Sequence, residues 1–398
     1  MSKGAAFKGK DEPDLASGRA YAAVAALLHE SKTAPPDALG SFLAERTSQL
    51  GLTDLSVYVT DFEQRHLVPI PGASDSQSLL IDDSQGGRVF TSAKQSEEAT
   101  ESGTRVWSVV VDGAARLGVI SMVFAHVDDD ARLLADSLAG VVAALLVTRG
   151  QCTDVYTNIR RSEKVSLAAE MQWQLLPPLS LDSGRISVAG LIQPAYEVGG
   201  DSFDYAINGN VLEFAVFDAM GHGLESSQLA HLAVTSYRHS RRCGLDLADT
   251  VEAMDAAVAQ MGDGEKFVTC IVGRLDASTG GLDWINVGHP LPILLRRGIV
   301  AGVLACEPTL PAGLGGAVAE RAHTVMQPGD RICCITDGVL DCHRPGGEDF
   351  GEDRLRTFLS EHSIRHDAAE TVRLLTHTVI EHHGVLSDDA TVFLVEYR

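Results

Sequence analysis

The alternation of apolar and polar positions predicts a small mixed domain in the first third of the chain. Two amphipathic stretches indicate helices, at residues 21–30 and 38–50. Strand-like runs follow, at residues 55–60, 105–111 and 115–124. Asp112-Gly113 stands between the last two runs, and Asp-Gly between apolar runs is a strong signal for a β-hairpin. The pattern therefore predicts helices beside a small antiparallel sheet.

A long helical pattern follows this domain. From about residue 128 to residue 176, apolar residues recur at intervals of three and four, which predicts an almost continuous helix. Pro177-Pro178 ends it, because the residue before a proline avoids the helical region. The apolar stripe, which includes Leu133, Leu138 and Leu145, is a candidate seam for a homodimer.

After the two prolines the pattern changes to strands with two strong helices. Apolar runs predict strands at residues 186–192, 211–217, 268–275, 282–287, 332–335 and 391–395. Apolar stripes predict helices over residues 246–261, with Asp246 as the N-cap, and over residues 368–380. Many strands with hairpin turns and two long helices favour a β-sandwich flanked by helices.

Composition narrows the class of protein. The 398 residues suffice for two or three domains with real cores, and the formal net charge is −22 at pH 7. That charge argues against a surface for nucleic acid or for an anionic membrane, because either would be repelled. The seven cysteines are odd in number and include no CxxC pair, so we expect neither a disulfide framework nor a thiolate zinc site.

The first fourteen residues are polar and lack the apolar core of a signal peptide. The longest apolar run, residues 138–147, has ten residues and is too short to span a bilayer. We therefore expect a disordered tail over residues 1–19, and a soluble cytoplasmic protein without a membrane segment.

Four aspartates are the candidates for chemistry. Asp218 ends one strand-like run, Asp337 follows another, and Asp388 precedes the last one. Asp201 lies in the glycine-rich segment EVGGDSFD at residues 197–204. Strands stacked in one sandwich can bring these carboxylates to one end of the domain.

Several ionised carboxylates at one place repel one another and need a compensating charge. All-oxygen ligation by carboxylates, a backbone carbonyl and water suits Mg²⁺ or Mn²⁺ rather than zinc. Two such ions can lower the pKa of a bridging water and hold a phosphoryl group for in-line attack. Each aspartate alone is weak evidence, since an Asp before Gly is more often a turn residue than a ligand.

Residues 20–127 resemble a GAF sensory domain. The likeness lies in the order of the elements and in the segments GRVFTSAKQ at 87–95 and RVWSVVVDG at 105–113. It implies a sensor that feeds a linker or signalling helix over residues 128–177. The motif typical of cyclic-nucleotide-binding GAF domains is not evident, which leaves the small ligand or partner of this domain open. The alternative is a generic α+β domain used for dimerisation.

About 230 C-terminal residues resemble the bacterial metal-dependent serine/threonine phosphatases of the SpoIIE type, relatives of protein phosphatase 2C in the PPM family. Seven segments match in the order of the family: AEMQWQLLP (169–177), VGGD (198–201), DAMGHG (218–223), FVT (267–269), NVGHP (286–290), TDGV (336–339) with EDFG (348–351), and DDAT (388–391). The resemblance implies an α+β chain whose phosphatase domain, residues 178–398, is an αββα sandwich.

The resemblance also implies a site and a reaction. Asp218 would bridge two Mn²⁺ or Mg²⁺ ions, and the carbonyl of Ala219 would ligate one of them. Asp337 and Asp388 would complete one metal site, and Asp201 would serve the other. Water activated by the two metals would hydrolyse phosphoserine or phosphothreonine without a covalent intermediate. In this family the substrates are commonly anti-anti-sigma (STAS) proteins, so a phosphorylated STAS regulator is the expected partner.

The segment at residues 168–176 resembles the regulatory switch of the family, through which the N-terminal sensor would gate activity. Ser202 stands where the family often has an aromatic residue, and Ala219 where the wider family has Gly, but neither change removes a ligand. No counterpart of the phosphate-binding arginine of eukaryotic relatives is evident, which leaves substrate positioning open. His222 and His289 could protonate the leaving oxygen, but support of their own loops is the favoured interpretation.

Two alternative functions remain at this point. One is a catalytically silent scaffold that binds a phosphoprotein, and the other is a nucleotide cyclase, which also pairs aspartates on two metals. The intact set of four aspartates disfavours the scaffold, and the order of the seven segments disfavours the cyclase.

Overall fold

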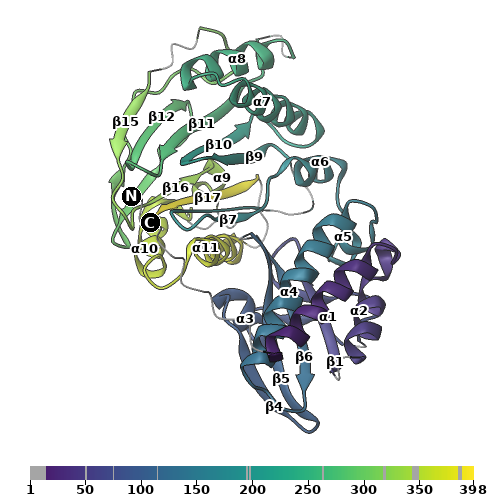
Figure 1. Cartoon of the computed structure of the whole chain (residues 1–398). Coiled ribbons are helices and arrows are strands. Elements are labelled where there is room, and N and C mark those ends of the chain that lie inside the picture. Colours follow the sequence, from purple (N-terminus) through teal and green to yellow (C-terminus); the bar gives the residue numbers. More distant parts are fainter. Residues whose placement is uncertain are drawn as a thin grey trace, which may run out of the picture. The chain divides into compact units, whose positions relative to one another are not determined.

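The computed structural model describes residues 15–398 except 50–51, 75, 114, 194–195, 197–198, 262–263, 317–319, 343–348 and 384–387. The chain divides into two compact units (Figure 1). The first comprises Met1–Asp112 and Arg116–Ser162, and the second Gly113–Ala115 and Glu163–Arg398. The expectation for the first fourteen residues lies outside the described residues. A disordered tail that reaches residue 19 is wrong, because helix α1 begins at Leu15.

The first unit is a six-stranded sheet with helices on both faces. Its helices are α1 (Leu15–Ser31), η1 (Pro36–Ala38), α2 (Leu39–Ser48), α3 (Gln85–Ser92), α4 (Asp129–Gly150) and α5 (Val155–Ile159). Its strands are β1 (Thr53–Thr60), β2 (His66–Pro69), β3 (Leu79–Leu80), β4 (Ser96–Thr100), β5 (Gly103–Asp112) and β6 (Ala115–Phe124). They run in the order β3-β2-β1-β6-β5-β4, so the hairpin predicted at Asp112-Gly113 is confirmed. One apolar cluster joins the sheet to α1, α2 and α4, and another joins it to α3. The GAF-like identity of this unit stays a prediction.

The single helix expected over residues 128–177 is wrong, because the structure has three helices there. Helix α4 ends at Gly150, the short helix α5 follows it, and a separate helix α6 (Leu167–Leu175) begins after α5. The Ser166 hydroxyl accepts a hydrogen bond from the Ala169 amide, which caps α6 at its own N-terminus. The boundary between the two units falls at residues 162–163, inside the expected linker.

The apolar stripe of α4 is largely buried within its own unit. Leu138, Val142 and Leu145 belong to the cluster that joins α4 to the sheet, so much of the stripe predicted as a dimer seam serves the core. Among the described residues, α4 is the one helix long and apolar enough to cross a membrane. Half of its most apolar window is buried inside the protein.

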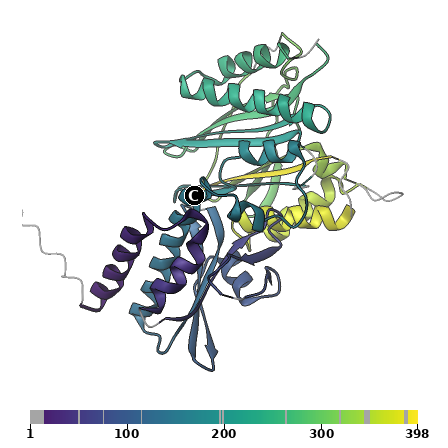
Figure 2. The same cartoon turned by 90° about the vertical axis from the view of Figure 1, so that its right-hand side faces the viewer.

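The second unit is a sandwich of two antiparallel sheets between two layers of helices (Figures 1 and 2). One sheet has the order β15-β12-β11-β10-β9, and the other β14-β13-β16-β17-β8-β7. The strands of the first sheet are β9 (Asp201–Asn208), β10 (Val211–Ala219), β11 (Val268–Asp276), β12 (Gly281–Val287) and β15 (Ala322–Val325). Those of the second are β7 (Ser180–Asp182), β8 (Ile186–Gln193), β13 (Ile293–Arg296), β14 (Ile299–Val303), β16 (Arg331–Ile335) and β17 (Ala390–Tyr397).

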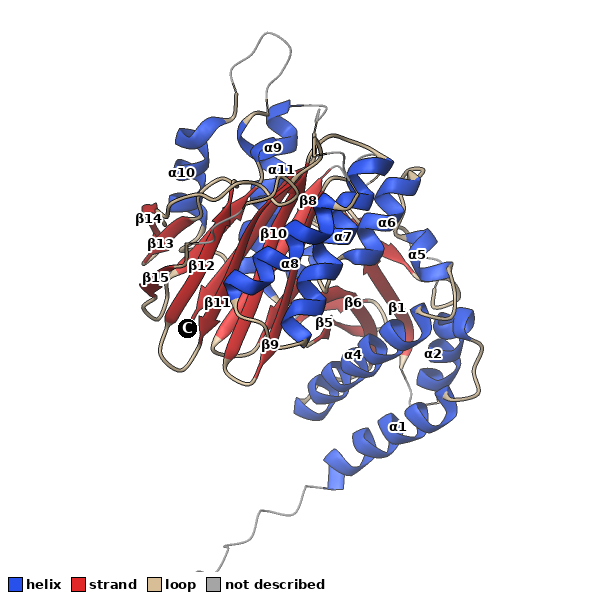
Figure 3. Cartoon of the chain, turned by 90° about the horizontal axis from the view of Figure 1, so that it is seen from above, coloured by secondary structure: helices blue, strands red, loops and turns tan. Residues whose placement is uncertain are grey.

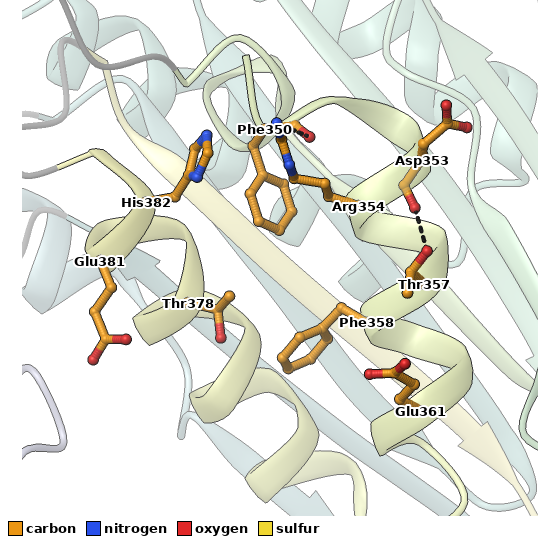
Figure 4. Close-up of a pocket in the computed structure, with 9 residues that line it drawn as sticks. All are labelled: Phe350, Asp353, Arg354, Thr357, Phe358, Glu361, Thr378, Glu381 and His382. Atoms are coloured by element: carbon orange, nitrogen blue, oxygen red, sulfur yellow. Dashed lines mark hydrogen bonds between the residues drawn. The ribbon is translucent and has the colours of Figure 1, made fainter. Parts of the chain in front are cut away.

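Helices cover the outer face of each sheet. The helices α7 (Leu224–Arg242) and α8 (Leu247–Ala259) share an apolar cluster with the first sheet and lie across it in Figure 3. The helices α10 (Gly351–His362) and α11 (Ala368–His383) share another with the second sheet, and α9 (Asp337–Leu340) is a single turn. The predicted αββα sandwich is therefore confirmed, as are the six predicted strands and both predicted helices. Asp246 caps α8 as expected, since its side chain accepts from the Asp249 amide.

Aromatic rings pack together in the core between the sheets. Phe393 of β17 lies with its ring centroid 5.3 Å from that of Phe203 and 5.9 Å from that of Phe214. Gly190 pairs with Phe393 across the second sheet, and a Cβ at residue 190 would come within 2.6 Å of the Phe203 ring. The missing side chain leaves the space that this ring fills.

Candidate active site

The four predicted aspartates come from four strand ends at one end of the sandwich. Asp201 opens β9 and lies directly opposite Asp218, the last residue but one of β10. Asp337 follows β16, and Asp388 stands two residues before β17. Since β16 and β17 are neighbours in the second sheet, each sheet supplies two aspartates to this end. Val198 of the matching VGGD segment lies outside the described residues.

Asp201 joins the two sheets. Its side chain is 2% exposed, and its Oδ2 accepts hydrogen bonds from the Thr336 hydroxyl at 2.7 Å and the Thr391 hydroxyl at 2.6 Å. Burial raises the pKa of Asp201 well above its usual range, and the charges of Asp389 and Asp218 raise it further. The two threonines orient this carboxylate from the far sheet.

Asp218 has the other carboxylates around it. Burial first, and then the charges of Asp337, Asp388 and Asp389, raise its pKa to about 7. Its neighbour Ala219 is held by a 3.1 Å hydrogen bond from its amide to the Gly200 carbonyl. The charges that raise this pKa come from residues at the strand ends of the second sheet, so the carboxylates of the two sheets repel one another.

Asp337 and Asp388 lie at the open side of the cluster. Burial, followed by the charges of Asp388 and Asp341, raises the pKa of Asp337. Asp388 is exposed, and its Oδ1 accepts from the Asp389 amide at 2.9 Å. Residue 338 must be glycine for this arrangement, because a Cβ there would lie 1.9 Å from the Asp389 carbonyl oxygen.

Sequence reasoning missed the role of Asp389. This side chain is 2% exposed, and its Oδ2 accepts from the amides of Gly200 at 2.7 Å and Asp201 at 3.1 Å. Gln172 of α6 donates to the same oxygen at 3.4 Å and to the Asp201 carbonyl at 2.9 Å. Burial raises the pKa of Asp389 to about 7. The available signal was the Asp388-Asp389 doublet, which puts two carboxylates next to each other in the sequence.

His289 supports its loop. Its Nδ1 lies 2.9 Å from the Thr269 hydroxyl, and its backbone exchanges hydrogen bonds with the Asn286 side chain. Burial lowers the pKa of His289 to about 3, so the ring is neutral at pH 7. His222 is exposed in the turn after β10. The interpretation of His289 as a structural residue agrees with this geometry.

The donor set fits hard divalent cations. Five aspartates contribute oxygen atoms to one end of the sandwich, and the buried Asp389 Oδ1 has no hydrogen-bond partner. Carboxylate oxygens are the ligands of Mg²⁺ and Mn²⁺, whose charge would relieve the mutual repulsion. Within the described ranges, no three His, Cys, Asp or Glu side chains converge closely enough to enclose a metal by themselves. The predicted set also relies on the Ala219 carbonyl and on water.

Comparison with known proteins agrees with this geometry. The family model of Stage II sporulation protein E (SpoIIE) matches residues 208–398. The second unit carries a SpoIIE-type PP2C phosphatase domain. Asp218, Asp337 and Asp388 lie within the matched residues, and Asp201 lies before them.

Two curated relatives extend the comparison. Protein IcfG of Synechocystis is 25% identical over 280 residues, which cover 62% of this chain and 43% of IcfG. The phosphoserine phosphatase RsbP of Bacillus subtilis is 21% identical over 248 residues, which cover 61% of this chain and 59% of RsbP. The chain thus spans about half the length of these relatives.

One solved structure shows the shared fold. The SiaA-PP2C domain of Pseudomonas aeruginosa aligns with a TM-score of 0.50 at 20% identity. The alignment covers 58% of this chain and 94% of that domain, as expected if the second unit alone corresponds to it.

Proposed function

We propose that this chain is a metal-dependent protein serine/threonine phosphatase. The observation that carries the proposal is the convergence of Asp201, Asp218, Asp337 and Asp388 from four strand ends of one sandwich. The SpoIIE-type match of the same unit supports it.

The residues have distinct parts in this proposal. Asp218 would contribute to both Mn²⁺ or Mg²⁺ sites, and the Ala219 carbonyl would serve one of them. Asp337 and Asp388 would complete one site, and Asp201 would serve the other. Such ions, when bound, activate water and neutralise the charge of the phosphoryl group. Asp201 is fixed for this by its two threonine hydrogen bonds. Asp389 instead positions the backbone of the turn that leads into β9.

The substrate we propose is a phosphoserine or phosphothreonine in a STAS-type anti-anti-sigma protein. The support is the similarity to RsbP, which is a phosphoserine phosphatase. The net charge of −22 is no obstacle to a phosphorylated substrate, because bound cations supply local positive charge.

We also propose that the first unit gates the second and that the chain is a cytoplasmic homodimer. The segment best placed for gating is α6, since Gln172 contacts both the Asp201 carbonyl and the Asp389 carboxylate. A shift of α6 would break these hydrogen bonds and release the turn that carries Asp201. The ligand of the first unit is undefined in this proposal.

The test is phosphate release by the purified full chain from p-nitrophenyl phosphate and from a phosphorylated STAS protein. The proposal expects release from both substrates with Mn²⁺ or Mg²⁺ and none with EDTA. Release from p-nitrophenyl phosphate alone would retain the enzyme and reject the STAS substrate. Binding of the phosphoprotein without release under any metal would favour the silent scaffold.

A further inference from the structure

Among the described residues, at least five large apolar side chains are exposed near the carboxylate end of the second unit. They are Met220, Leu224, Met261, Leu310 and Leu314, and their exposed fractions range from 40% for Leu314 to 53% for Leu310. Single exposed apolar residues are ordinary on a protein surface. These five are notable because they project from connected segments beside one functional end, and we call them the apolar rim.

Hydrogen bonds join the segments that carry the rim. Met220 stands two residues after Asp218, and its amide donates to the Phe267 carbonyl at 3.1 Å. Lys266, the residue before Phe267, forms a 3.0 Å ion pair with Glu225 in the first turn of α7, beside Leu224. Helix α7 begins near the carboxylates and leads away from them, and α8 then returns toward them. Met261 stands just after the end of α8.

The two leucines of the rim are held in solvent by an anchored segment. The Asp255 carboxylate of α8 accepts from the amides of Gly313 at 2.7 Å and Gly315 at 3.1 Å, on either side of Leu314. Ala312 and Val268 exchange two 2.9 Å backbone hydrogen bonds, which pin the segment to the start of β11.

The anchoring continues before Leu310, because the Thr309 amide donates to the Asn286 carbonyl at 2.9 Å at the end of β12. The backbone is therefore fixed on both sides of each leucine. An apolar side chain that a fixed backbone keeps in water is unfavourable in the free protein. It favours binding, since little backbone conformational freedom is lost on contact.

We infer that the apolar rim is a recognition surface for the substrate protein, and that its occupant is the peptide chain on either side of the phosphorylated residue. This inference rests on the proposed function. A phosphoryl group at Asp218 brings the chain that carries it over Met220, because each residue of an extended chain advances only about 3.3 Å.

The chemistry of the rim selects apolar side chains in that occupant. Among the described residues beside the rim, Lys266 and Glu225 form an ion pair in which the two charges offset each other. Methionine and leucine offer adaptable apolar contact, so the favoured substrate carries leucine-like residues near its phosphoserine.

The test uses two phosphoserine peptides of equal length, one with leucines flanking the phosphoserine on both sides and one with serines there. The full chain with Mn²⁺ is expected to prefer the leucine peptide by at least about tenfold in kcat/KM, the effect of burying about one leucine side chain. The double variant Leu310→Ser/Leu314→Ser should reduce the preference to less than about threefold. The matched control Ile299→Ser/Val325→Ser also replaces two exposed apolar residues, on the edge strands β14 and β15, and should keep the preference.

Several results would overturn the inference. Equal kcat/KM values for the two peptides in the wild type would do so, as would an undiminished preference in the Leu310→Ser/Leu314→Ser variant. Self-association of the wild type that this variant abolishes, seen by sedimentation velocity, would assign the rim to a second copy instead.

The design separates this inference from the proposed function. Hydrolysis of p-nitrophenyl phosphate, which has no flanking chain, reports the carboxylate site alone. Hydrolysis of that compound without a peptide preference rejects the rim and retains the phosphatase. If nothing is hydrolysed, the proposed function fails. Fluorescence anisotropy of the two fluorescein-labelled peptides then tests the rim: tighter binding of the leucine peptide supports it, and equal affinities reject it.

Discussion

Asp218 lies directly opposite Asp201 on the neighbouring antiparallel strand. Like charges directly opposite in a sheet destabilise it, and here both side chains are withdrawn from water as well. Burial and neighbouring carboxylates raise the pKa of both groups. Holding the two charged groups together is therefore unfavourable and offsets part of the free energy of folding. The relationship makes sense in a site that binds cations.

The first prediction is a reversal of stability. In EDTA, Asp218→Asn is expected to be more stable than the wild type by about 1–2 kcal/mol, because the substitution removes one repelling carboxylate. With Mn²⁺ at 100 times its dissociation constant, the wild type should gain about 2.7 kcal/mol and become the more stable protein. Thermal unfolding of both proteins under the two conditions measures this. Glu252→Gln, an exposed change on α8, is the control, and the same order of stability in EDTA and in Mn²⁺ would contradict the prediction.

The second prediction concerns the threonines that hold Asp201. Thr391→Val removes the 2.6 Å hydrogen bond to Asp201 Oδ2 and should weaken Mn²⁺ binding by about 10–100-fold, the usual effect of losing a partner of a metal ligand. The measurement is calorimetric titration with Mn²⁺. Thr376→Val is the matched control, since that buried hydroxyl donates to Val372 within α11. Equal Mn²⁺ affinities of the two variants would count against a metal role for Asp201.

The third prediction is a pH dependence of stability that arises from His289. Burial lowers the pKa of His289 to about 3, whereas an unfolded histidine titrates near 6.5. Between these values the unfolded chain binds a proton that the folded chain does not. Stability should therefore fall as the pH drops below about 6.5, by up to about 1.4 kcal/mol per pH unit from this residue.

Urea unfolding of the wild type and His289→Asn at pH 7, 5.5 and 4.5 measures this contribution. The difference in stability between the two proteins should shrink toward low pH, because the variant has no imidazole to protonate. A constant difference across this range would show that His289 titrates normally.

The fourth prediction concerns the first unit. Deletion of residues 1–162, up to the boundary between the units, should change either the maximal rate of phosphate release or the Mn²⁺ concentration that gives half of this rate. The reason is that α6 contacts the Asp201 turn through Gln172 and loses its connection to the first unit. Unchanged values of both quantities, in a fragment that unfolds cooperatively, would reject gating.

The regular parts of the phosphatase fold could be predicted from the sequence. Strands such as β10 and helices such as α8 have apolar residues at the spacing of their own secondary structure, and Asp246 marks a helix start by its chemistry. Asp218 could be singled out for the same reason, since a polar residue at the end of an apolar strand is visible in one dimension. The convergence with Asp337 required knowledge of which strands become neighbours.

The errors have a common physical cause. Helical periodicity continues from α4 to α6, but periodicity does not report where a chain leaves one core and enters another. Ser166 was a usable sign of a new helix, because a hydroxyl before an apolar run is an N-cap signal. Asp389 was missed because its role depends on amides from the distant Gly200 turn.

The exposure of the apolar rim was equally invisible in the sequence. Leu310 and Leu314 read as ordinary apolar residues in a segment without periodicity. The carboxylate of Asp255, far away in the chain, holds the segment that keeps Leu314 in solvent. Long-range hydrogen bonds of this kind are a property of the folded chain alone.

A comparison of the wild type with Asp218→Asn in phosphate release from a phosphoserine peptide, with Mn²⁺ and with EDTA, tests whether these aspartates form a metal-dependent phosphatase site. Release by the wild type is expected only with Mn²⁺, and the variant is expected to lose at least about 100-fold, since it lacks the carboxylate that would contribute to both metal sites. Release that persists in EDTA, or equal rates in the two proteins, would contradict a metal-dependent phosphatase built on these aspartates.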